Sequence, residues 1–115
     1  MDIELDELAS RLDEVRVIDV RRPEEYDGTL GSVCDPRQGH IPGALNIDVQ
    51  ELMTLTEDEL RERVGVEAGG EVVCYCHSGS RSAMAVLALQ RFGYDARNYP
   101  GSWHEWSRTE LPYEP

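Results

Sequence analysis

The chain has 115 residues, of which 40% are hydrophobic, so it is long enough for one domain with a core and too short for two. Its formal net charge of -12 repels nucleic acid and anionic membranes, and no apolar run reaches the ~20 residues needed to cross a bilayer. The acidic N-terminus does not resemble a secretory signal, so we expect a cytoplasmic protein with neither nucleic acid nor membrane among its partners.

The predicted elements alternate between helix and strand from the first residues onward. The N-terminal half combines a helical period of apolar residues, a β-branched strand, a short helical turn, a long loop containing glycine and proline, a short strand and a short helix with an aspartate cap. In chain order these are residues 3–12, 15–20, 23–26, 27–43, 44–47 and 48–53.

The C-terminal half continues the same alternation. It contains a helix that opens on a capping box, the clearest strand, an apolar helix that ends before Gly93, a short strand and a last helical turn, which are residues 56–63, 71–76, 82–92, 96–99 and 101–108. Residues 83–89 are apolar all round, so we expect that helix to be buried. The alternation predicts an α/β domain with a mainly parallel sheet, whose sites form at the carboxyl ends of strands.

Cysteine and histidine usage bears on disulfides and metals. The three cysteines are Cys34, Cys74 and Cys76, and an odd number argues against a disulfide framework. The sequence has no Cys-x-x-Cys pair and its histidines are far apart, so we predict no metal site and no cofactor. Cys74 follows two valines and is interpreted as a buried structural residue, and Cys34 as an incidental one.

Cys76 ends the clearest strand, and a polar loop and then a helix follow it; the loop is His77-Ser78-Gly79-Ser80-Arg81. The loop N–H groups, the helix N-terminus and the Arg81 guanidinium all favour a thiolate, the reactive form of cysteine. Gly79 allows backbone angles that a side chain would forbid. Arg81 stands five positions after Cys76, one fewer than in cysteine phosphatases, and the smaller cradle suits one extra sulfur atom better than a phosphate.

Four segments, in order, resemble the signatures of rhodanese domains. They are Asp19-Val20-Arg21 with Pro23-Glu24-Glu25-Tyr26, then Gly39-His40-Ile41-Pro42-Gly43-Ala44-Leu45-Asn46, then Cys76-His77-Ser78-Gly79-Ser80-Arg81-Ser82-Ala83, and finally Asn98-Tyr99-Pro100-Gly101-Ser102-Trp103-His104-Glu105-Trp106. The last looks like the end of the catalytic half of two-domain thiosulfate and mercaptopyruvate sulfurtransferases. The resemblance predicts a single rhodanese-like domain over residues 3–112. It implies a three-layer α/β fold whose five-stranded, mainly parallel sheet is flanked by helices.

The resemblance also implies a reaction. Cys76 would accept sulfane sulfur as a persulfide from thiosulfate or a similar small donor and pass it to cyanide or a thiol by double displacement. The residues around the donor would be His77, Ser78, Gly79, Ser80 and Arg81, with Asp19, Arg21 and Trp103 in support.

Several of these roles have a structural alternative. Asp19 either forms an ion pair with Arg21 or acts at the site, and His77 either contacts the donor or is merely exposed. His40 is interpreted as making a structural hydrogen bond. Trp103 packs in the core and can help to exclude water from the site.

Two departures from the two-domain enzymes affect the donor. Their inactive half is not among these residues, so we expect a more open site or one that a second chain covers. Many of them have Arg where Glu25 stands, so donor binding would depend on Arg81, on Arg21 or Arg22, and on the loop amides, with weaker affinity for thiosulfate. The Gly79-Ser80-Arg81 ending of the loop nevertheless favours thiosulfate over mercaptopyruvate.

Three alternatives stand beside the enzyme hypothesis. A non-turnover persulfide carrier or interaction module would be loaded by a partner such as a cysteine desulfurase or would exchange with a thioredoxin. A phosphatase or arsenate reductase of the same fold would need a wider loop. A purely structural domain would leave Cys76 and its loop without explanation.

Overall fold

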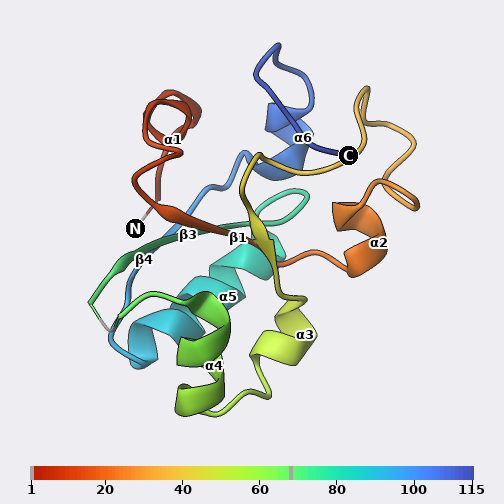
Figure 1. Cartoon of the computed structure of the whole chain (residues 1–115). Helices are drawn as coiled ribbons and strands as arrows, with labels where there is room; N and C mark the ends of the chain where they lie inside the picture. The colour runs from red at the N-terminus through yellow and green to blue at the C-terminus, as the bar shows by residue number, and fades with distance from the viewer. Residues whose placement is uncertain (1, 68) are drawn as a thin grey trace.

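The computed structural model describes residues 2–67 and 69–115 and arranges them in three layers, with a parallel sheet between two groups of helices (Figure 1). The sheet has the strand order β2-β1-β3-β4, and the strands are β1 Arg16–Asp19, β2 Leu45–Asn46, β3 Glu71–Tyr75 and β4 Asp95–Asn98. The helices are α1 Leu5–Ser10, α2 Pro23–Tyr26, α3 Val49–Leu52, α4 Glu57–Val64, α5 Ser80–Arg91 and α6 Ser102–Trp106. The predicted α/β class and parallel sheet are therefore confirmed.

Alternate residues of the strands face opposite layers. Val17 and Val73 pack with α1 and α6, including both tryptophans. Ile18, Val72 and Cys74 pack on the other face with α3, α4 and α5. Both faces of the central strands are covered, which is why their sequences are continuously apolar. Cys74 lies inside the second of these clusters, as the sequence predicts.

The sheet differs from the prediction at its β4 edge. The resemblance implies five strands, and the described residues form four. The fifth position holds only an isolated parallel bridge between Asp2 and Asn98, in which the Ile3 N–H donates to the Asn98 carbonyl at 2.9 Å. Because the backbone at Ile3 is bound to the sheet edge, the helix predicted from residue 3 begins only at Leu5.

Local capping follows the sequence, but the burial of α5 does not. Thr56 and Glu59 form the predicted capping box, with N–H to side-chain oxygen distances of 2.9 and 3.2 Å. Gly93 adopts φ 88° just after α5, as expected for the residue that follows a helix C-cap. Met84 and Leu87 are 52% and 62% exposed, because only one side of α5 faces the sheet. One side of α5 is therefore buried and the other exposed, and the expectation that the apolar residues 83–89 are all buried is wrong.

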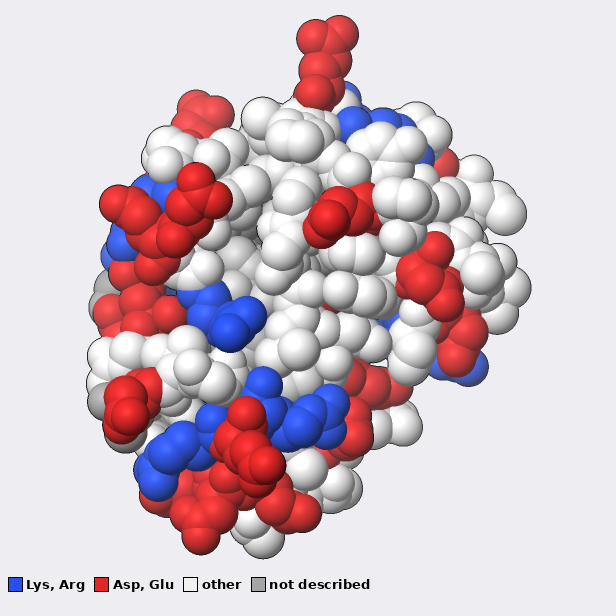
Figure 2. All heavy atoms as spheres, in the orientation of Figure 1, with Lys and Arg blue, Asp and Glu red and all other residues white. Residues whose placement is uncertain are grey.

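Surface charge follows the composition. Figure 2 shows Asp and Glu side chains spread over this face of the molecule, with Arg side chains beside many of them. Within the described ranges, each helix falls short of the length and hydropathy that a membrane crossing demands.

Candidate active site

Two segments with reactive or charged side chains meet at the carboxyl edge of the sheet. Strands β1 and β3 are neighbours, and Asp19 is opposite Tyr75 in the parallel register. The Val20 N–H extends this pairing by donating to the Tyr75 carbonyl at 3.0 Å. The residues that follow the two strands, Arg21 and Cys76, therefore lie at the same edge, which is where sites in parallel sheets form.

The Cys76 sulfur faces the polar groups of its own loop. Its Sγ accepts hydrogen bonds from the Gly79 N–H at 3.0 Å and from the Ser82 hydroxyl at 3.4 Å. Burial raises the pKa of this thiol, but the Ser82 hydroxyl and the N–H groups of Ser82, Gly79 and Ser78 outweigh burial and hold the pKa below its ordinary value. Helix α5 begins at Ser80, so its positive end lies beside the same sulfur. The arrangement stabilises a thiolate.

Gly79 makes the close approach of the loop amide possible. Its φ is 98°, in the left-handed region, and a Cβ there would lie 2.9 Å from the Pro100 carbonyl oxygen. The Gly79 carbonyl in turn accepts a hydrogen bond from the Asn98 side chain at 3.2 Å. The loop is therefore held against the end of β4, and the Gly79 position is restricted to glycine.

Two serines contact this loop that sequence reasoning did not single out. Ser82 lies in the first turn of α5 and is fully buried. Ser102 has φ 53°, and its Oγ accepts the Cys76 N–H at 3.1 Å and donates to the Tyr99 carbonyl at 2.9 Å. The position of Ser82, directly after the loop and in the first turn of α5, could have indicated its contact. No local pattern marks Ser102, whose partner is 26 residues away.

Arg81 is bound to Glu25. Its Nη1 and Nη2 lie 2.8 and 3.1 Å from the two Glu25 carboxylate oxygens, and the Arg22 N–H donates to the same carboxylate at 3.2 Å. Burial raises the pKa of Glu25, but the hydrogen bonds from Arg81 and from the Arg22 backbone outweigh it and leave the pKa below its ordinary value. Arg22, Glu25, His77 and Arg81 line a recess of about 320 Å³. The cation expected to bind a donor anion is thus already neutralised.

Asp19 and Arg21 form a buried ion pair. Arg21 Nη2 lies 2.7 Å from Asp19 Oδ2 and also donates to the Gly39 carbonyl at 2.6 Å. The guanidinium lies 5.2 Å from the centre of the Trp103 ring. Because the Arg21 side chain is 1% exposed and its Nε and Nη2 already donate to Asp19 and to the Gly39 carbonyl, the expectation that Arg21 helps to bind a donor anion is corrected. Trp103 is fully buried in the core.

Asp35 gathers His77, His104 and Arg108 beside the Cys76 loop. Its buried carboxylate lies 3.0 Å from both His77 Nε2 and Arg108 Nη1, and 4.0 Å from His104 Nδ1. Ligand-type atoms of Asp35, His77 and His104 lie within 4.8 Å of one another, so these are the residues that could hold a metal ion. This corrects the expectation that the histidines are too scattered. Arg108 and His77 already occupy the carboxylate, so these contacts form a network that joins the long loop to the Cys76 loop and to the end of α6.

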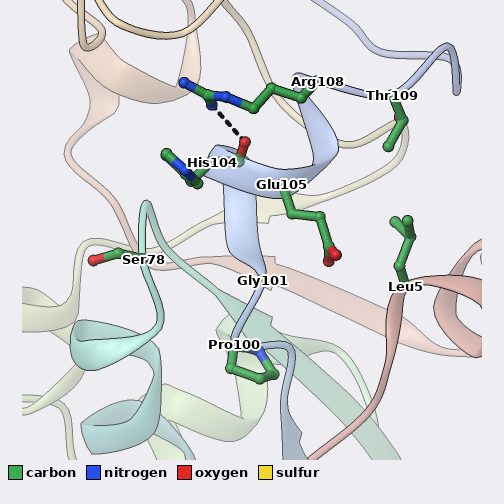
Figure 3. Close-up of a pocket in the computed structure, with 8 residues that line it drawn as sticks. All are labelled: Leu5, Ser78, Pro100, Gly101, His104, Glu105, Arg108 and Thr109. Atoms are coloured by element: carbon green, nitrogen blue, oxygen red, sulfur yellow. Dashed lines mark hydrogen bonds between the residues drawn. The ribbon is translucent and has the colours of Figure 1, made fainter.

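A larger hollow of about 580 Å³ lies beside α6 and is lined in part by Ser78 (Figure 3). His104, Glu105 and Arg108 line it too, and Arg108 donates to the His104 carbonyl at 2.6 Å. Cys76 itself lines neither this hollow nor the 320 Å³ recess. Two residues of its loop, His77 and the cationic Arg81, line the recess, whereas Ser78 alone of the loop lines the hollow, so the recess is the better candidate for the approach of a small anionic donor.

Fold and site together define a class of protein: an α/β domain that stabilises a cysteine thiolate at a helix N-terminus beside a parallel sheet. The chain belongs to the rhodanese-like domain family, whose family model matches residues 4–109. The family recognised from the four sequence segments is thereby confirmed.

Named relatives point in the same direction. A protein of Mycobacterium tuberculosis named "Putative thiosulfate sulfurtransferase SseB" is 40% identical over 101 residues, which cover 81% of this chain and 35% of that protein. The sulfur carrier protein TtuD of Thermus thermophilus is 36% identical over 106 residues, which cover 78% of this chain and 37% of TtuD. The chain thus spans little more than a third of the length of these curated relatives.

The chain is also similar to a solved structure of a single-domain protein, and this match covers nearly the whole length of both chains. The human single-domain sulfurtransferase TSTD1 has a TM-score of 0.72 and 32% sequence identity, and the match covers 95% of this chain and 96% of that one. The same three-layer domain therefore also occurs without a second half.

Proposed function

We propose that this chain is a sulfurtransferase that carries sulfane sulfur as a persulfide on Cys76. The donor is thiosulfate or a similar small molecule, and the acceptor is a thiophile such as cyanide or a thiol. The single rhodanese-like domain over residues 3–112 is the unit that carries out the transfer. The observation that supports the proposal most directly is the hydrogen bonding of the Cys76 sulfur to the Gly79 N–H and the Ser82 hydroxyl.

The chemistry proceeds in two displacements. The Cys76 thiolate attacks the outer sulfur of thiosulfate, the S–S bond breaks, and sulfite leaves with the electron pair. The acceptor then attacks the outer sulfur of the persulfide, and Cys76 leaves as a thiolate. Groups that stabilise the Cys76 thiolate act in both steps. In the first step they increase the fraction of Cys76 that is present as the nucleophilic thiolate, and in the second they stabilise Cys76 as the leaving group.

The loop residues have separate tasks in this scheme. The Gly79 and Ser78 N–H groups and Ser82 stabilise negative charge on sulfur. Ser80 begins the helix whose dipole acts on the same atom. His77 and Arg81 line the recess through which the donor approaches.

Three residues away from the sulfur support the scaffold. The buried Asp19–Arg21 pair fixes the end of β1 to the glycine-rich segment, since Arg21 also binds the Gly39 carbonyl. Trp103 closes the core beneath that pair, which keeps water away from the inner side of the site.

Mass spectrometry of the intact protein tests the proposal. Incubation with thiosulfate should add one sulfur atom, about 32 Da, to the wild type with release of an equal amount of sulfite. Cys76→Ala should gain nothing, and Cys34→Ser, which removes an exposed cysteine in the long loop, should gain sulfur like the wild type. A wild type that gains no sulfur from thiosulfate or from a persulfide donor would refute the proposal.

A second candidate is a persulfide carrier that a partner enzyme loads. Two observations favour it: Glu25 occupies Arg81, and one relative is named a sulfur carrier protein. Slow turnover with thiosulfate and cyanide, together with rapid loading by a cysteine desulfurase and discharge to a thioredoxin, would support the carrier over the enzyme.

A further inference from the structure

We propose that Glu25 sets the donor specificity of this site, because it competes with a donor's anionic group for the Arg81 guanidinium. The site then favours persulfides, R–S–SH, over the thiosulfate dianion. The inference rests on the proposed sulfur transfer through Cys76 and names the class of donor that serves it.

The Arg81–Glu25 contact has the geometry of a strong pair. Both carboxylate oxygens face the guanidinium at 2.8 and 3.1 Å, which is the two-point arrangement that best matches these groups. The Arg81 and Glu25 side chains are 33% and 19% exposed, so water weakens their attraction only in part. The Arg22 N–H also donates to Oε1 of this carboxylate at 3.2 Å and helps to hold it in place. A donor anion must break this arrangement before it can use Arg81.

The surroundings offer little compensating charge. The two arginines that line the 320 Å³ recess are both paired, Arg81 with Glu25 and Arg22 with Glu24 at 3.4 Å. Asp48 lies with Arg22 and Arg81 around a neighbouring hollow of about 300 Å³. A dianion that displaced Glu25 would therefore meet the freed carboxylate and two further acidic side chains at close range.

A persulfide donor does not meet this obstacle. The Cys76 thiolate attacks the outer sulfur of R–S–SH, the S–S bond breaks, and R–S⁻ leaves, so that Cys76–S–SH and one thiolate are formed. Charge and atoms balance without any oxidant or reductant. Since the negative charge of such a donor is smaller than that of thiosulfate, its reaction depends less on a free guanidinium.

The test compares two donors on matched variants. Loading of Cys76 is followed by intact mass with thiosulfate and with cysteine persulfide, for the wild type, Glu25→Gln and Glu57→Gln. Glu57 is also paired with an arginine, Arg61 at 2.9 Å, but it lies on α4 and lines neither the recess nor the neighbouring hollow, so its substitution is the matched control. We expect Glu25→Gln to raise the second-order rate constant for thiosulfate by about tenfold, equivalent to about 1.4 kcal/mol. The rate with cysteine persulfide should change less than about twofold, as should both rates in Glu57→Gln.

A double variant checks that the gain acts through the guanidinium. Adding Arg81→Gln to Glu25→Gln should return the thiosulfate rate to the wild-type level or below it. An unchanged or lower thiosulfate rate in a folded Glu25→Gln, or a gain that persists without Arg81, overturns the inference. If neither donor adds sulfur to any of these proteins, the proposed function fails and the specificity inference fails with it.

Discussion

Removal of the Ser82 hydroxyl should make Cys76 harder to ionise. The hydroxyl lies 3.4 Å from the Cys76 sulfur and 3.2 Å from the Gly79 carbonyl oxygen, and the side chain is fully buried. A hydrogen bond to a charged group contributes about 1.5–3 kcal/mol, and the long distance and the competing carbonyl place this one at the lower end. Since 1.36 kcal/mol corresponds to one pKa unit, Ser82→Ala should raise the pKa of Cys76 by about one unit.

The consequence for sulfur loading is smaller than the change in thiolate fraction. Below both pKa values, a rise of one unit leaves about one tenth of the thiolate. The more basic thiolate is a better nucleophile, with a Brønsted coefficient of about 0.4–0.5, which recovers about threefold of that loss. Ser82→Ala should therefore load sulfur about three- to fourfold more slowly at low pH. Above the pKa of the variant, where both proteins are fully ionised at Cys76, the variant should load about threefold faster.

The assay follows Cys76 alone among the three cysteines. Proteins are alkylated with iodoacetamide at a series of pH values, and modification is read on the Cys76 peptide by mass spectrometry, with thiolate absorbance as a second measure. Ser80→Ala is the matched control, because Ser80 is exposed at the start of the same helix. A Ser82→Ala midpoint equal to that of the wild type, or a similar shift in Ser80→Ala, would show that the Ser82 hydroxyl does not stabilise the thiolate.

Three further predictions concern stability. Asp19→Ala leaves the Arg21 guanidinium buried without its carboxylate, so urea unfolding should show a loss of about 3–5 kcal/mol; a loss below about 1 kcal/mol would contradict the role of this pair. Asp35→Asn should lower the free energy of unfolding by about 1.5–3 kcal/mol, against about 0.5 kcal/mol or less for the exposed Asp58→Asn, and equal effects would show that the network contributes nothing. Because the folded pKa of Cys76 is below its ordinary value of 9.0, its stabilising contribution is present above pH 9.0 and is lost as pH falls through the folded pKa. The stability of the wild type relative to Cys76→Ser, from unfolding curves at several pH values, should therefore rise with pH up to about 9, and a difference that shrinks as pH rises would refute the linkage.

Helix caps, turn glycines and strand ends could be predicted because they depend on residues that are close in sequence. The Thr56–Glu59 capping box, the glycine after α5 and the strand that ends at the Cys76 loop all formed as expected. Gly79 was correctly expected to adopt angles that other residues avoid. In each case the partners lie within one or two turns of backbone, so periodicity and residue type are sufficient.

Other features of the site could not be read from local pattern. The Arg81–Glu25 pair joins residues 56 positions apart, and the Asp35–His77 contact spans 42. The sequence marks each of these side chains as polar, but it does not say which partner each one meets. As a result, Arg81 was expected to be free for a donor, and the histidines were expected to stay apart.

The amino-acid sequence by itself determined the order of elements, the family and the reactive loop around Cys76, because these are written in short motifs and in the alternation of apolar residues. Only the tertiary structure decided that one bridge at Asp2 takes the place of a fifth strand within residues 2–67 and 69–115, that Arg21 is buried in an ion pair, and that Glu25 neutralises Arg81. The physical reason is that an ion pair, or a backbone hydrogen bond at the sheet edge, depends on the distance between segments that are far apart in sequence. Those distances are set only when helices pack on both faces of the sheet.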